Sequence, residues 1–277
     1  CLVCIATTSF DQPFLLARRF SSLDLASGGR AGWNLVTSTH RAEAESFGTQ
    51  PHMAKSERYR RAREFAHVTR GLWNSFDDDA FPRDKESGVF LDRDKLHILE
   101  HEGEHFQVRG PLNVPPSPQG EPVMVQAGSS EDGRELAAET AEVVFGIHQT
   151  LEGAQGFYAD VKARMAAYGR HPDALKIMPG LMVYVGHDKE AAAEKFEMMQ
   201  DLIDDRTGIE FLSNRMDFDF SGHDPDGPVP DIEFDNVRSS RGQLYLDVAR
   251  REDLTTRGPR PPGAGAGGPV PGVGSPW

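Results

Sequence analysis

The sequence predicts an α/β protein whose strands form one parallel sheet. Short apolar segments alternate with amphipathic segments, the alternation repeats about five times, and Gly or polar residues separate the segments. Parallel neighbours need long connections, which crossover helices supply. A doubly wound sheet and a TIM-type (β/α)8 barrel both fit this pattern, and the periodicity does not choose between them.

Five segments have the composition of strands. They are rich in apolar residues, and the first, with its Val, Ile and Thr, is expected to be buried on both faces. The five predicted strands are LVCIATTS at 2–9, GWNLVTS at 32–38, PVMVQAG at 122–128, VVFGIH at 143–148 and IMPGLMVYVG at 177–186.

The segments between and after these strands carry apolar residues at helical spacing. Between Glu57 and Phe76, for example, apolar positions recur every three or four residues, which predicts one buried helical face. The helix at 13–27 is expected to end at Gly28 and Gly29. The other predicted helices are 130–141, 151–168 and 190–204.

Two segments depart from the strand–helix alternation. Residues 95–110 alternate around Gly103 and predict a β-hairpin, and residues 208–240 form a long polar insertion loop. The hairpin contains HEGEH at 101–105, which matches the HExxH pattern of zinc proteases. Because that chemistry needs both His on one helix face, we expect a solvated hairpin and no metal site there.

The composition restricts the classes of function. The net charge is −13 and the pI is near 5.2, so a general nucleic-acid binder and a polybasic membrane-surface protein are not expected. No apolar run is long enough to span a bilayer, and CLVCIATTSF lacks the features of a secretory signal. We therefore expect a cytoplasmic protein without nucleic-acid or membrane partners.

The two cysteines and the tail at 258–277 carry weaker signals. Cys1 and Cys4 have CxxC spacing, but on a strand they are expected to be buried and inert, in a reducing compartment. The tail is rich in Gly and Pro, which predicts disorder. Such a string is also what GC-rich DNA encodes when it is translated out of frame beyond Arg257.

Small polar residues follow three of the predicted strands. Gly128, Ser129 and Ser130 lead into a helix, and this turn offers free backbone N–H groups and two hydroxyls, which suits a phosphate. Simple N-capping by Ser is common and explains the same residues without a ligand. The segments ATTS at 6–9 and WNLVTS at 33–38 bring further hydroxyl and amide groups to strand ends. Ligands bind at such ends in α/β folds, so we expect one shared pocket.

Four long segments resemble flavin-dependent monooxygenases. Residues 13–38, 57–81, 84–145 and 175–186 are similar to the nitrilotriacetate and dibenzothiophene-sulfone monooxygenase group of the bacterial-luciferase-like superfamily. The resemblance covers about 2–257 in order, and it is the resemblance that selects the TIM-type barrel. It implies an incomplete barrel domain at 1–257 that holds about strands 3–7 of eight.

The resemblance also implies an activity. Family members use FMN that a separate NAD(P)H:flavin reductase has reduced, together with O2, to oxygenate a small organic molecule. An aminopolycarboxylate, an organosulfur compound or an alkane is the expected substrate class, and a complete barrel would be expected to form a homo-oligomer. Two alternatives stay open: a non-functional truncated product of a damaged gene, and a deazaflavin-dependent oxidoreductase.

Carried over position by position, the resemblance implies contacts to FMN but no catalytic residue. His40 follows at the pocket edge as a candidate substrate contact, and Lys55 stands where family members often carry His. The residues expected to bind the cofactor are Thr7, Thr8, Asn34, Thr37, Ser38, Tyr59, Ser129 and Ser130.

Overall fold

A computed structural model provides the structure of the chain. Its described residues fall into two compact units, one comprising Cys1–Gly146 and Tyr158–Met178, the other comprising Ile147–Phe157 and the residues from Pro179 onward. The structure describes residues 2–39, 41–48, 53–148, 150–181, 183–202, 204, 206–207, 209–210, 213, 218–224, 226–230 and 232.

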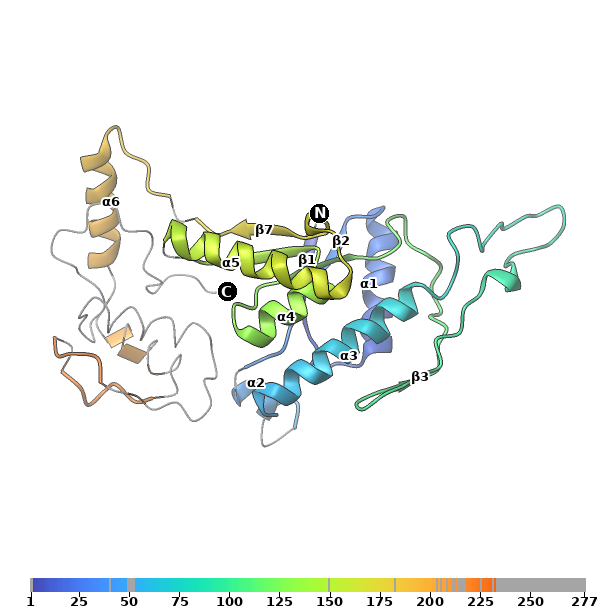
Figure 1. Ribbon diagram of the computed structural model, residues 1–277, viewed down its shortest axis with the longest axis horizontal. Coiled ribbons are helices and arrows are strands. Elements are labelled where there is room, and N and C mark those ends of the chain that lie inside the picture. Colours follow the sequence, from blue (N-terminus) through green and yellow to red (C-terminus); the bar gives the residue numbers. More distant parts are fainter. Residues whose placement is uncertain are drawn as a thin grey trace. The chain divides into compact units, whose positions relative to one another are not determined.

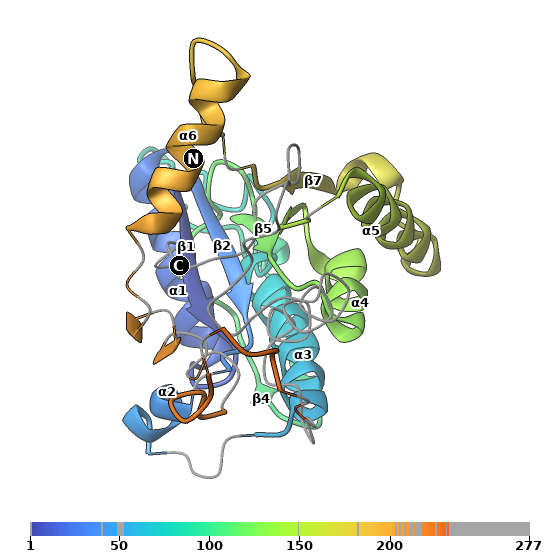
Figure 2. The ribbon, with the colours of Figure 1, turned by 90° about the vertical axis from the view of Figure 1, so that its left-hand side faces the viewer.

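Five strands form one sheet in the order β1-β2-β5-β6-β7 (Figures 1 and 2). The pairs β1–β2, β2–β5 and β5–β6 are parallel. A doubly wound sheet reverses its strand order at a switch point, whereas a barrel adds each strand on the same side. The sequential order therefore confirms the barrel-type prediction, and within the described residues the sheet does not close. The strands are β1 (Leu2–Thr7), β2 (Ala31–Val36), β5 (Val123–Gln126), β6 (Val143–Gly146) and β7 (Lys176–Pro179).

Three helices supply the core against one face of this sheet: α1 (Pro13–Ser27), α3 (Lys55–Trp73) and α4 (Glu131–Thr140). Trp33 of β2 lies at the centre, with its ring within 6.3 Å, between centroids, of the rings of Phe20, Phe65 and Trp73. Its indole N–H donates to the carbonyl oxygen of Ala6. The tryptophan thus joins β1, β2, α1 and α3 in one packed cluster.

The remaining elements include the predicted helices at 151–168 and 190–204, and one helix, at 41–46, that the sequence did not predict. They are the helices α2 (Arg41–Ser46), α5 (Leu151–Arg164) and α6 (Lys189–Asp201), and three single 3-10 turns at Arg93–Lys95, Met165–Tyr168 and Pro172–Ala174. Among the described residues, no helix combines the length and the apolar character that crossing a membrane requires. The predicted tail at 258–277 and most of the predicted insertion loop at 208–240 lie outside the described residues.

The predicted hairpin is confirmed as β3 (His101–Glu102) and β4 (Gln107–Val108), an antiparallel pair that runs beside α3 (Figure 1). The turn spans Gly103 to Phe106, and only glycine fits at its first position, because a Cβ there would collide with the carboxylate of Glu64 and with His101. The two histidines of HEGEH therefore lie on extended backbone and in its turn, as expected, and not on a helix.

The prediction that Cys4 is buried is wrong. Cys4 is an exposed thiol, and its neighbours Leu2 and Ile5 are 74% and 63% exposed. The cause is the position of β1 at one end of the strand order, where only β2 pairs with it. An apolar strand composition therefore indicates a sheet but does not distinguish a central strand from an edge strand.

A buried carboxylate fixes the connection from α1 to β2. Gly28 ends α1 with φ 67°, a left-handed conformation that glycine adopts at little cost. Asp24 is fully buried, and its Oδ1 accepts hydrogen bonds from the backbone N–H of Ala31 at 2.8 Å and from Nε2 of Gln119 at 2.6 Å. One carboxylate oxygen thus holds the end of α1, the start of β2 and the loop before β5.

We expect Asp24→Ala to lower the free energy of unfolding by about 2–3 kcal/mol, because it leaves the buried N–H of Ala31 without an acceptor and removes the bond to Gln119. Asp24→Asn retains an acceptor oxygen and should lose less. Asp78→Ala, at an exposed site, is the matched control and should stay within about 0.5 kcal/mol of the parent. Urea denaturation followed by tryptophan fluorescence measures all three; equal losses in Asp24→Ala and Asp78→Ala would contradict the assignment.

Candidate functional site

The carboxyl ends of β1 and β2 bring two predicted site residues into contact. Thr7 Oγ1 and Ser38 Oγ lie 2.6 Å apart, and Ser38 Oγ also donates to Glu43 Oε1 at 2.7 Å. The backbone N–H of Ser9 donates to Thr7 Oγ1 at 3.1 Å. The parallel register, with Thr7 opposite Val36, is what places these groups at one edge of the sheet.

The neighbouring residues Thr8 and Thr37 are held by main-chain contacts. Thr8 is fully buried, and its hydroxyl lies 3.3 Å from the carbonyl oxygen of Val36, to which it donates. The carbonyl oxygen of Thr37 accepts from Ser9 Oγ at 2.6 Å. These bonds tie the two strand ends together, so both residues support the geometry of the edge on which Thr7 and Ser38 lie.

Asn34 is the polar side chain on the sheet face that does not pack against α1 and α3. On β2 it alternates with Trp33 and Leu35, which belong to the helix-packed core, and in the register it lies between Ile5 and Val125. Its Oδ1 is buried and has no hydrogen-bond partner among the residues that the structure describes. Burying such an oxygen without a donor costs about 1–3 kcal/mol, so this atom is a candidate acceptor for an N–H or O–H group of a ligand.

The third strand end is the turn between β5 and α4. Ser130 is the N-cap residue of α4, and its Oγ accepts from the backbone N–H of Gly133 at 3.3 Å; Ser129 is exposed. A Cβ on Gly128 would lie only 3.0 Å from Cα of Gly133. The residues after β5 can therefore approach the first turn of α4 this closely only because both residues are glycines. The turn leaves N–H groups at the positive end of a ten-residue helix.

Tyr59 of α3 reaches this serine turn. Its hydroxyl lies 3.3 Å from Ser130 Oγ, so the structure brings these two predicted site residues together. Lys55, one turn earlier on α3, pairs with Asp132 of α4 at 3.3 Å. A hydroxyl, a serine and an ammonium group therefore surround the N-terminal end of α4.

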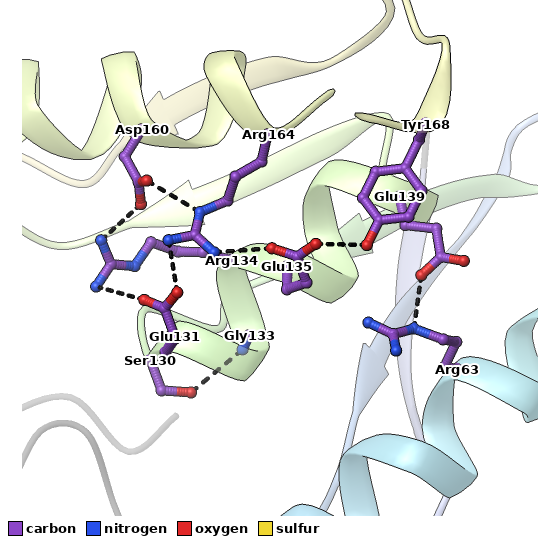
Figure 3. Close-up of polar contacts among 10 residues, drawn as sticks. All are labelled: Arg63, Ser130, Glu131, Gly133, Arg134, Glu135, Glu139, Asp160, Arg164 and Tyr168. Carbon is purple, nitrogen blue, oxygen red and sulfur yellow. Dashed lines mark hydrogen bonds and ion pairs between the residues drawn. The ribbon is translucent and has the colours of Figure 1, made fainter. Parts of the chain in front are cut away.

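Ion pairs from α5 hold α4 in place (Figure 3). Arg164 contacts Glu131 and Glu135 at 2.7 Å each and Asp160 at 2.9 Å. Arg134 contacts the other oxygen of Asp160 at 2.7 Å, and Arg63 of α3 pairs with Glu139 at 2.7 Å. These contacts were not predicted; the only signal is the four-residue spacing of Glu131 with Glu135 and of Asp160 with Arg164.

The same network shifts the pKa values of its members. The acceptors Glu135, Asp160 and Glu131 raise the pKa of Arg164 above its ordinary value. Burial and the hydrogen bond to Glu135 raise the pKa of Tyr168 to about 12. In return, the hydroxyl of Tyr168 and the guanidinium of Arg164 lower the pKa of Glu135. Arg164 therefore stays protonated and Glu135 stays ionised at neutral pH, so their ion pair persists.

Arg61 makes further contacts near the site that the sequence analysis did not predict. Its Nε donates to the carbonyl oxygen of Thr8 at 3.0 Å and its Nη2 to that of Asp11 at 3.2 Å, while the guanidinium lies 4.3 Å from the ring centroid of Phe106. Burial lowers the pKa of Arg61, although Glu64 and Glu57 act to raise it. Arg61 thus connects α3 and the hairpin to the turn after β1.

Glu64 anchors the hairpin that contains HEGEH. Its carboxylate accepts from Nε2 of His101 and from the backbone N–H groups of His105 and Phe106, each at 2.9 Å. Burial alone would raise the pKa of Glu64, but these three donors together lower it. Beside this anchor, side-chain atoms of Glu57, Glu104 and His105 lie near one another. Arg60 pairs with the carboxylates of Glu57 and Glu104.

The structure thus forms two groups from the predicted site residues, Thr7 with Ser38 and Tyr59 with Ser130. Thr8 and Thr37 support the first group, Ser129 adjoins the second, and Asn34 lies one strand position inside the edge. Their roles in binding stay predictions. His40 lies outside the described residues.

Comparison with known proteins gives consistent matches. The luciferase-like monooxygenase family matches residues 2–266. N-acetyl-S-(2-succino)cysteine monooxygenase of Bacillus subtilis is 46% identical over 92% of this chain and 59% of its own length. Nitrilotriacetate monooxygenase component A of Aminobacter aminovorans is 48% identical over 92% of this chain and 57% of its own. A riboflavin lyase solved with modified FMN and riboflavin superposes with a TM-score of 0.77, with 31% identity over 92% of this chain and 55% of that chain.

The chain therefore spans a little over half the length of the proteins it matches. The matched part includes the β1 and β2 ends, the serine turn and the hairpin, because all of them lie within 2–266.

We expect Glu64→Gln to lower the free energy of unfolding at pH 7 by about 1–3 kcal/mol, because a neutral amide accepts the three donors less strongly. The folded-state pKa of Glu64 is depressed, so its stabilisation is present above the unfolded pKa of about 4.3 and is lost as the pH falls through the folded value. Chemical denaturation at pH 7, 5 and 3 should show the two proteins converging at low pH. Glu102→Gln, exposed on the same hairpin, is the control; a pH-independent difference would refute the role of the ionised carboxylate.

Proposed function

Because this chain belongs to the luciferase-like monooxygenase family, we propose that it binds reduced FMN and uses O2 to oxygenate a small organic substrate. One observation carries the proposal: the three hydrogen-bonding groups around Thr7, Asn34 and Ser130 lie on consecutive parallel strands or directly after them. Such a row suits a long ligand with a ring at one end and a phosphate at the other.

The serine turn fits the phosphate of FMN. The free N–H groups of α4 and the hydroxyls of Ser129, Ser130 and Tyr59 are donors toward a dianion at the positive end of a helix. The close approach of Gly128 and Gly133 leaves the turn without Cβ atoms at those two positions. Lys55 adds a positive charge on the same side, although Asp132 already pairs with it.

The strand ends fit the flavin ring and its polyol chain. The unpartnered Oδ1 of Asn34 is an acceptor for a ring or hydroxyl donor, and Thr7 and Ser38 extend the polar edge beside it. Thr8 and Thr37 position these groups through their bonds to the neighbouring strand end. The apolar side chains of Ile5 and Val125 flank Asn34 in the register, and a flavin ring packed against them would exclude water from this surface.

When it is bound, reduced FMN supplies two electrons, so that one atom of O2 enters the substrate and the other leaves as water. The residues of this chain bind and orient the ring and exclude water. A separate NAD(P)H:flavin reductase would deliver the reduced cofactor. One of the two relatives is named for N-acetyl-S-(2-succino)cysteine and the other for nitrilotriacetate, and we propose an aminopolycarboxylate, an organosulfur compound or an alkane as the substrate.

The phosphate site is tested by comparing FMN with riboflavin, which lacks the phosphate. In anaerobic titrations followed by fluorescence, Ser130→Asp should weaken binding of reduced FMN at least tenfold, because a carboxylate repels the phosphate, and leave reduced riboflavin unchanged. Asp is as good an N-cap residue as Ser, so α4 should stay folded.

Ser22→Ala, at an exposed position of α1, is the matched control and should bind both ligands like the parent. Circular dichroism checks that the overall helix content is unchanged. An equal loss of FMN and riboflavin affinity in Ser130→Asp would show that the turn does not contact the phosphate. Absence of saturable FMN binding by the parent chain would contradict the proposed function itself.

A further inference from the structure

Glu43 of α2 forms a hydrogen-bonded chain with Ser38 and Thr7 that fixes where each hydroxyl proton lies. Ser38 Oγ contacts both Glu43 Oε1 at 2.7 Å and Thr7 Oγ1 at 2.6 Å. An ionised carboxylate only accepts hydrogen bonds, so the single proton of Ser38 points to Glu43. Thr7 must then donate its own proton to Ser38.

This assignment leaves each hydroxyl without a free proton. Thr7 Oγ1 donates to Ser38 and accepts from the backbone N–H of Ser9, which leaves one lone pair. Ser38 Oγ donates to Glu43 and accepts from Thr7, which also leaves one lone pair. Toward any ligand, the Thr7–Ser38 pair is therefore an acceptor and not a donor.

The backbone of Ser38 has a strained conformation. Ser38 is 9% exposed and has φ 47°, a left-handed conformation that is uncommon outside glycine and costs of order 1 kcal/mol. This conformation turns the chain from β2 toward α2, where Glu43 lies five residues later. Strained residues of this kind are often found at ligand sites.

We propose that atom N5 of the flavin ring faces the Thr7–Ser38 pair, and that Glu43 is a positioning residue that makes this pair select reduced over oxidised flavin. This inference rests on the proposed function. The reduced isoalloxazine ring carries an N–H at its N5 atom, whereas the oxidised ring has a bare acceptor nitrogen there. An acceptor pair matches the first and leaves the second facing lone pairs, so the hydrogen-bond direction that Glu43 sets translates into a preference for the reduced cofactor.

The test is the ratio of the dissociation constants for oxidised and reduced FMN. Glu43→Gln keeps the size of the side chain but offers an amide N–H that can donate to Ser38, which frees the hydroxyl protons to turn toward the ligand. We expect this variant to lower the ratio about tenfold, the equivalent of one hydrogen bond, mainly by weakening the reduced form. Glu43→Asp keeps a carboxylate acceptor and should retain part of the preference.

The outcomes separate this inference from the function on which it rests. If Glu43→Gln binds both forms but keeps the parental ratio, the positioning role is wrong while the flavin site stands. If it weakens both forms equally, Glu43 only supports the fold of the strand end, and the inference is again overturned. If the parent binds neither form, the proposed function fails, and this inference fails with it. A lowered ratio in Glu43→Gln that Glu43→Asp restores in part would support it.

Discussion

The parallel pairing of β1, β2 and β5 is the constraint on which the candidate site depends. In a parallel ladder every strand ends at the same edge of the sheet. Residues more than a hundred positions apart in sequence therefore reach that edge without any loop crossing over the sheet. Thr7, Ser38 and Ser130 follow this rule. The register matters as well, because a shift of one residue would move Asn34 to the face that Trp33 occupies.

The helices that cover the sheet have a second role, which is to hold the loops at that edge. Arg61 binds the carbonyl oxygens of Thr8 and Asp11, and Tyr59 on the same helix contacts Ser130. The ion pairs of Arg164 fix α4 from the opposite side (Figure 3). Single surface ion pairs contribute little to stability, but several that share one guanidinium restrict the orientation of a helix. Orientation is what a helix N-terminus needs if it is to contact a ligand.

Much of this arrangement could be predicted from the sequence, and the part that could not has physical reasons. Apolar periodicity is a local property, so α1, α3 and α4 and all five strands appear near their predicted positions. The exposure of Cys4 depends on which strand pairs with β1, and that is not a local property. The contacts of Arg61 and Glu43 were missed for the same reason: surface helices carry many charged residues, and only the folded chain shows which of them turns inward.

The site residues differ in how much their identity alone explains. A serine or threonine hydroxyl can donate or accept, so listing Thr7 and Ser38 as ligand contacts does not say which ligand atoms they prefer. Their preference is set by the next residue in the chain of hydrogen bonds, because a carboxylate accepts and never donates when ionised. With Glu43 at the end, the polarity of both hydroxyls is determined. At this edge of the sheet, chemical selectivity therefore comes from a residue that need not contact the ligand at all.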